Sequence, residues 1–144
     1  MTGGFSQGFC SVAPCGAEGR IITGRRLANC LVQIGDDGEL VLSHGSAVVA
    51  RAPAAGVQIV TPPSVRRIGT AVILLVDSQV LAVEFDSVYR RQRESARAAS
   101  RAGSVLRSVF GLPNVSRGMR VGRALAREFA AALTAAGAAD RATA

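Results

Sequence analysis

The segment Gly4-Phe5-Ser6-Gln7-Gly8 matches the G-x-S-x-G pattern that surrounds the nucleophilic serine of many hydrolases. Such a serine needs a strand before it and a helix after it, because a sharp strand-to-helix turn exposes its hydroxyl. Only three residues precede this segment, and the residues that follow it contain a proline and several glycines. The sequence therefore predicts that Ser6 is not a nucleophile.

Three cysteines and one histidine are the other candidates for chemistry: Cys10, Cys15, Cys30 and His44. A structural zinc site uses four ligands and usually a closer cysteine pair than Cys10 and Cys15, which are separated by four residues. We expect Cys30 to act as a small buried hydrophobic residue, and Cys10 and Cys15 to be mobile free thiols. His44 precedes a glycine and is expected in a solvated turn. The sequence predicts no catalytic residue, no metal and no cofactor, so the protein is expected not to be an enzyme.

Arginine supplies all 17 basic side chains, against ten acidic ones, for a net charge of +7. Residues 87–144 hold eleven arginines and three acids, whereas residues 1–86 hold six arginines and seven acids. Four arginines from 90 to 101 are spaced by three, four and four residues, which places them on one face of a helix. The predicted anion-binding residues are Arg90, Arg93, Arg97, Arg101, Arg107, Arg117 and Arg120.

Two interpretations of this arginine series are open. A run of charge usually faces water, and an alanine-rich chain without lysine is typical of a GC-rich genome. However, only Glu94 and Glu128 lie in the same two segments, and like charges one turn apart repel by a few tenths of a kcal/mol. An anionic partner would offset that repulsion. Four apolar residues beside the arginines are predicted to contact a membrane or a partner: Leu106, Val109, Phe110 and Leu112.

Apolar residues alternate with polar ones from Leu27 to Phe85, which is typical of antiparallel strands. Turn-forming residues such as Gly35-Asp36-Asp37-Gly38 separate the apolar stretches. The predicted strands are 27–34, 39–43, 47–51, 57–60, 65–68, 70–76 and 79–85.

The apolar period changes from two to 3.6 residues at Asp86. A first helix is predicted from there to about Phe110, before Gly111-Leu112-Pro113. A second helix is predicted from residue 114 or 116 to about 136, and its apolar face is expected to close the core. That face includes Val121, Leu125, Phe129 and Leu133.

This order of elements resembles the pleckstrin-homology-like (PH/GRAM-like) superfold, in which a bent sheet is closed by its last helix. The resemblance covers Leu27–Phe85 and Met119–Leu133, and rests on element order and on stretches such as Gly38-Glu39-Leu40-Val41-Leu42 and Val80-Leu81-Ala82-Val83-Glu84-Phe85. It implies an α+β fold: an antiparallel six- or seven-stranded bent sandwich or partly open barrel, followed by two C-terminal helices.

Two features depart from that family. Members that bind phosphoinositides carry a basic first hairpin, whereas Asp36-Asp37-Gly38-Glu39 here would repel phosphate. The tryptophan that many members have in the closing helix is absent, and Phe129 is the nearest large substitute. The resemblance therefore implies the fold without inositol-phosphate binding, and the helix at about 87–113 is an Arg-rich insertion.

The expected organisation is a flexible arm at 1–19, a single domain at 20–140 and a tail at 141–144. We expect a non-enzymatic adaptor domain whose arginine-rich helices dock on an anionic membrane leaflet or an acidic protein. One alternative is a protein that binds nucleic-acid phosphates, and another is a structural subunit of a larger assembly. The absence of a signal peptide and the odd number of cysteines predict a cytoplasmic protein, peripheral on the inner face of the membrane.

Overall fold

The computed structural model describes residues 4–16, 20–99 and 114–141. Within these residues, eight strands form one sheet in the order β4-β3-β2-β1-β7-β6-β5-β8. The strands are β1 Phe5–Pro14, β2 Leu27–Ile34, β3 Glu39–His44, β4 Ala47–Pro53, β5 Gln58–Ile59, β6 Ala71–Val76, β7 Gln79–Glu84 and β8 Ala139–Asp140. The α-helices are α1 Pro63–Ile68, α2 Val88–Ala99 and α4 Asn114–Ala135, and the short 3-10 helices are η2 Thr23–Arg25 and η3 Ala54–Gly56.

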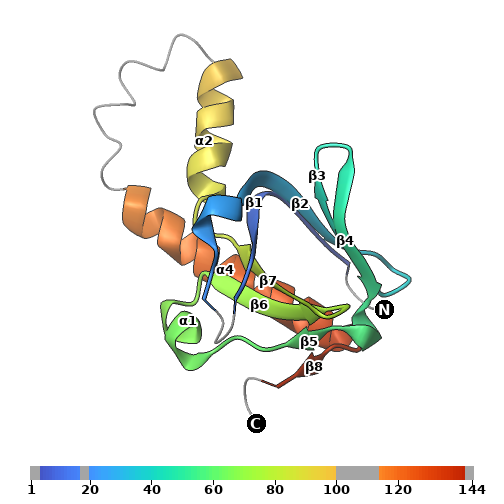
Figure 1. Ribbon diagram of the computed structural model, residues 1–144. Coiled ribbons are helices and arrows are strands. Elements are labelled where there is room, and N and C mark those ends of the chain that lie inside the picture. The colour runs from blue at the N-terminus through green and yellow to red at the C-terminus, as the bar shows by residue number, and fades with distance from the viewer. Residues whose placement is uncertain (1–3, 17–19, 100–113, 142–144) are drawn as a thin grey trace.

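The predicted α+β class, with an antiparallel sheet followed by a closing helix, is confirmed. The sheet is open, with β4 and β8 at its two edges, and the short β5–β8 pair is parallel. In Figure 1, α4 passes across the sheet behind β6 and β7, while α2 rises from the end of β7. The predicted strands at 27–34, 39–43, 47–51, 70–76 and 79–85 correspond to β2, β3, β4, β6 and β7.

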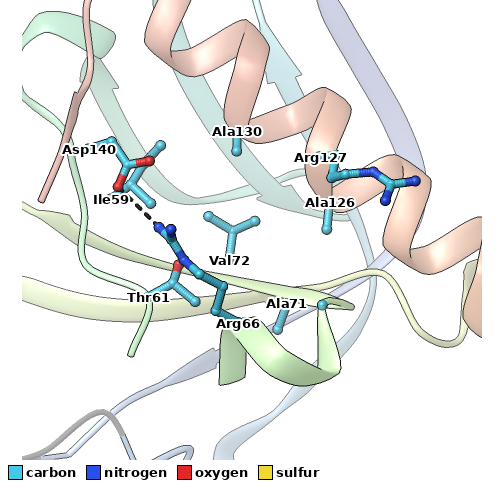
Figure 2. Close-up of a pocket in the computed structure, with 10 residues that line it drawn as sticks. Ile59, Thr61, Arg66, Ala71, Val72, Ala126, Arg127, Ala130 and Asp140 are labelled. Atoms are coloured by element: carbon cyan, nitrogen blue, oxygen red, sulfur yellow. Dashed lines mark hydrogen bonds and ion pairs between the residues drawn. The ribbon is translucent and has the colours of Figure 1, made fainter. Parts of the chain in front are cut away.

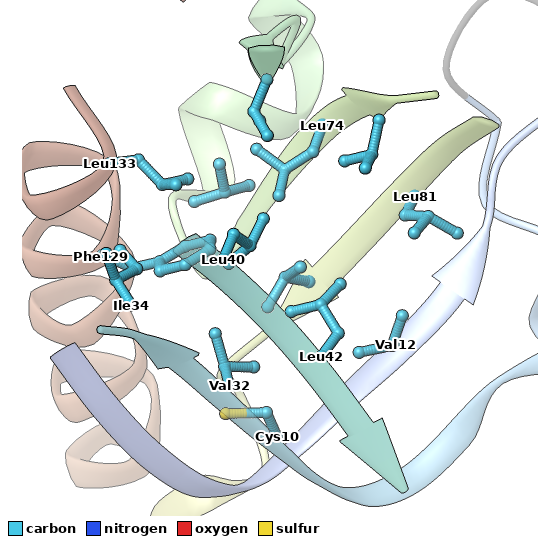
Figure 3. Close-up of a cluster of buried hydrophobic side chains, with 14 of the residues drawn as sticks. Cys10, Val12, Val32, Ile34, Leu40, Leu42, Leu74, Leu81, Phe129 and Leu133 are labelled. Carbon is cyan, nitrogen blue, oxygen red and sulfur yellow. The ribbon is translucent and has the colours of Figure 1, made fainter. Parts of the chain in front are cut away.

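The core lies between the sheet and α4, and Phe129 is at its centre, as predicted. Its side chain is fully buried, and its ring centroid lies 5.3 Å from that of Phe5 and 5.6 Å from that of Phe85. Aliphatic side chains fill the rest of the core, as Figure 3 shows for residues of β1, β2, β3 and α4. This packing holds α4 against the sheet because aromatic rings remove a large apolar area from water.

The expected flexible arm at residues 1–19 is wrong for its central part. Residues 5–14 form β1, which lies in the middle of the sheet and pairs with both β2 and β7. Cys10, Val12 and Ala13 are buried there. Cys10 is therefore not a mobile thiol, and Cys15 is half-buried, with its backbone N–H donating to the Val80 carbonyl at 2.8 Å.

Two other elements differ from the prediction. The expected strand at 65–68 is the helix α1, which begins after Pro62 and ends at Gly69, whose φ of +83° favours glycine. The strand expected at 57–60 consists only of the two residues of β5. A strand that was not predicted, β8, pairs with β5 in parallel.

Candidate anion-binding site

The predicted anion-binding residues are only partly within the described residues. Arg90 is exposed and Arg93 is half-buried on α2, whereas Arg117 and Arg120 are exposed on the first turns of α4. Arg97 belongs to α2, but its side chain is not described. The remaining predicted site residues lie outside the described part of the chain: Arg101, Leu106, Arg107, Val109, Phe110 and Leu112.

Tyr89 brings arginines from the two helices together. The Arg93 guanidinium carbon lies 5.8 Å from the centre of the Tyr89 ring, one turn along α2. A hydrogen bond with Arg117 of α4, and further the charges of Arg93 and Arg117, lower the pKa of the Tyr89 phenol. The two guanidiniums beside Tyr89 give this junction a positive charge, which attracts anions.

Gly122 allows α4 to pack closely against the segment in which β7 leads into α2. A Cβ atom at Gly122 would lie 2.9 Å from the Phe85 carbonyl oxygen, and one at Gly118 would lie 4.0 Å from the Tyr89 Cβ. Since a Cβ contact below 3.0 Å needs the backbone to shift, a larger residue at Gly122 would push α4 away. The spacing of four residues places both glycines on one face of the helix, where Gly118 lies at ordinary contact distance from Tyr89.

Arg91 has a different role from its neighbours on α2. Its Nη1 donates a hydrogen bond of 3.1 Å to the Asn29 Oδ1 of β2, and its buried Nε makes no hydrogen bond within the described residues. This contact holds α2 against the sheet. Because Arg91 faces β2, Arg90 and Arg93 are directed toward solvent and toward α4. This anchoring contact was not predictable from the helix pattern, because it depends on a residue in a distant strand.

Arg26 is neutralised within the fold. Its Nε and Nη2 donate to the two carboxylate oxygens of Glu84 at 2.7 and 3.0 Å, and the Glu84 side chain is 9% exposed. This bidentate ion pair ties the start of β2 to the end of β7. Arg26 is therefore structural and does not add to the anion-binding surface.

Two arginines in the middle of α4, Arg123 and Arg127, lie beside α1 or the pocket next to it. The Arg123 Nε donates to the Ile68 carbonyl at 2.9 Å, which satisfies a free carbonyl at the C-terminus of α1. Arg127, one turn further, lines a pocket. The arginine series of α4 is therefore divided: Arg117 faces α2, and Arg123 and Arg127 lie toward α1.

The pocket beside α1 has a volume of about 290 Å³. Its walls include Ile59, Val72, Ala126 and Ala130, as Figure 2 shows. At one end the Arg66 Nη2 lies 3.3 Å from the Asp140 Oδ1. The pocket can hold a small apolar group next to this ion pair. Because the Asp140 carboxylate offsets the charge of Arg66, the pocket attracts anions less than the α2–α4 junction does.

The other chemical candidates are not assembled into a site. Ser6 lies within β1, opposite Gln33, and is not on a strand-to-helix turn. His44 is exposed on β3, which is separated from β1 by β2. Among the described residues, no three His, Cys, Asp or Glu side chains gather where they could hold a metal ion.

Comparison with protein-family models, curated proteins and solved structures finds no match to this chain. None of the described helices has the length and apolar character needed to cross a membrane.

Proposed function

We propose that this protein is a non-enzymatic binding domain that docks on an anionic surface, a membrane leaflet or an acidic protein, through α2 and the start of α4. The observation that carries the proposal is the convergence of Arg93 and Arg117, from two helices, on Tyr89. Arg90 and Arg120 are exposed on the same two helices. Together they form the docking face, defined as Tyr89, Arg90, Arg93, Arg117 and Arg120.

The charge around the docking face favours an external anion. Glu94 is the single acidic residue of α2, and α4 has no acidic residue before Glu128. Arg117 and Arg120 also lie in the first two turns of α4, where the helix dipole is positive and cations are disfavoured. An anion would relieve both the repulsion between the guanidiniums and this unfavourable dipole.

The architecture supports placing the domain among the pleckstrin-homology-like superfold. Antiparallel strands precede a helix that packs across the core, with α2 as an insertion between the last long strand and that helix. We place the protein in the cytoplasm, peripheral on the inner leaflet, because that leaflet carries anionic lipids.

Vesicle co-sedimentation of the full chain tests this function. Each arginine near an anionic leaflet contributes about 1 kcal/mol, so binding to phosphatidylcholine vesicles is expected to rise steeply with the phosphatidylserine fraction. Added salt is expected to weaken binding, because screening shortens the reach of each charge. Poly-glutamate, as a probe for an acidic protein, is expected to compete with the vesicles.

A DNA shift assay over the same salt series separates the alternatives. Binding to duplex DNA without binding to vesicles or poly-glutamate would contradict the proposal and favour a nucleic-acid-binding protein. In that case the logarithm of the affinity would fall with the logarithm of the salt concentration, with a slope of about 0.9 per phosphate contacted. Binding to none of the three would also contradict it and favour a subunit of an assembly.

A further inference from the structure

Two cysteines far apart in the sequence lie directly opposite each other in the sheet. Cys10 of β1 and Cys30 of β2 are paired in the antiparallel register. Opposite residues in such a pair have Cα atoms about 4.5–5.5 Å apart and side chains on the same face of the sheet. That separation lies within the range of about 4.4–6.8 Å that a disulfide bond requires.

The backbone on either side of this pair is irregular in a way that aligns the two cysteines. The register shifts once between Gln7 and Cys10, and once between Cys10 and Val12. The residue before each cysteine has a positive φ, +62° at Phe9 and +58° at Asn29. Such conformations cost energy for residues other than glycine, and persist only where the surrounding structure imposes them. One such residue precedes each of the two paired cysteines, and both cysteines are buried.

In the reduced protein, each of the two thiols donates its hydrogen bond to a backbone carbonyl. The Cys10 Sγ donates to the Gln7 carbonyl at 3.3 Å, and the Cys30 Sγ donates to the Leu27 carbonyl at 3.4 Å. Both residues are 0% exposed, and Figure 3 shows Cys10 among the core side chains. Burial and, to a smaller extent, the neighbouring Cys30 raise the pKa of Cys10 to about 12.

We propose that Cys10 and Cys30 form a cross-strand dithiol that a small peroxide oxidises to an intramolecular disulfide. Burial raises the pKa of the Cys30 thiol as well, but a hydrogen bond with the Val12 backbone opposes that rise, so Cys30 is assigned as the nucleophile. The Cys30 thiolate attacks one peroxide oxygen, the O–O bond breaks, and the products are a Cys30 sulfenic acid and water. The Cys10 sulfur then attacks the Cys30 sulfur, and the sulfenic hydroxyl leaves as a second water with the Cys10 proton. The two thiols lose two electrons and two protons, and one hydrogen peroxide becomes two waters.

Cys15 is the internal control for this site. It is half-buried, more accessible than either paired cysteine, and its bridge partner is Ile21 instead of another cysteine. If accessibility alone decided oxidation, Cys15 would react first. If the register decides which disulfide forms, the product links Cys10 to Cys30 and leaves Cys15 reduced.

The test treats the folded full chain with hydrogen peroxide, alkylates the remaining thiols in denaturant, and maps the peptides by mass spectrometry. We expect one product, a Cys10–Cys30 link two hydrogens lighter than the dithiol, with Cys15 alkylated. Its rate is expected to rise about tenfold per pH unit below the thiol pKa, because the thiolate reacts. The link is expected to raise the melting temperature by about ten degrees, since it restrains the unfolded chain.

Two controls make the result decisive. The Cys15→Ser variant is expected to form the same link, whereas oxidation in concentrated urea is expected to give all three possible pairs. Three results for the folded chain would overturn the proposal: a disulfide that includes Cys15, oxidation of Cys15 alone, or no oxidation of any of the three thiols. Because the mapping uses the unaltered chain, these outcomes do not depend on whether a cysteine variant folds.

Discussion

Deletion of residues 1–14 is expected to abolish the cooperative unfolding transition of this protein. These residues contain β1, which lies between β2 and β7, so their loss divides the sheet into two parts and exposes two strand edges. The deletion also removes Phe5, Cys10, Val12 and Ala13 from the core and its margin. We expect circular dichroism to show no sigmoidal thermal transition.

A pair of proline substitutions gives a milder form of this test. Ala13→Pro places proline in the middle of the sheet, where it removes a backbone donor and is not tolerated. Ala47→Pro makes the same change at the first residue of the edge strand β4, where proline is accepted. Ala13→Pro is expected to cost several times more unfolding free energy than Ala47→Pro. Equal costs would contradict the central position of β1.

The Phe129→Ala substitution is expected to lower the free energy of unfolding by about 3–5 kcal/mol. The ring is fully buried between Phe5 and Phe85, so truncation loses apolar burial and leaves a cavity beneath α4. Urea unfolding measures this loss of stability, and the slope of the unfolding free energy against urea concentration is expected to stay unchanged.

The neighbouring Glu128→Ala is the matched control for Phe129→Ala. Glu128 is exposed on the same helix, so its truncation is expected to change stability by no more than about 0.5 kcal/mol. A loss below about 1 kcal/mol for Phe129→Ala would mean that α4 does not close the core.

The strands that obey simple alternation are the ones that sequence reasoning predicted well. β2 and β3 place Val32 and Leu42 inward in regular alternation with more exposed residues, and a short turn rich in glycine and aspartate separates the two strands. β1 was not predicted because the bulge between Gln7 and Cys10 interrupts its alternation, and because its glycine and serine residues are typical of loops. Its burial is imposed by the strands on either side.

The six residues of α1 show a second limit of sequence patterns. Val65 and Ile68 fit a short strand as well as they fit a helix, since six residues are too few to separate the two periods. Pro63 and Gly69, at the two ends, were the better evidence, because proline favours the first helical position and glycine favours a helix stop.

The candidate site was predictable in its charge but not in its geometry. The spacing of Arg90 and Arg93 identified one face of α2, and that face bears the docking residues described above. Tyr89 and Gly122 were missed because their roles arise only where α4 crosses α2. Arg91 was not separated from the other arginines, because its partner Asn29 lies in another part of the sequence.

The central claim is that the docking face, and not net charge alone, binds an anionic surface. The most direct measurement compares two variants with equal loss of charge in co-sedimentation with phosphatidylserine-containing vesicles. The docking-face variant carries Arg90→Gln, Arg93→Gln, Arg117→Gln and Arg120→Gln. The matched variant carries the same change at four exposed arginines outside α2 and α4: Arg20, Arg25, Arg67 and Arg141. Both variants are expected to keep the parental circular dichroism spectrum. We predict that the docking-face variant loses vesicle binding while the matched variant keeps most of it, and equal binding by the two would contradict the account.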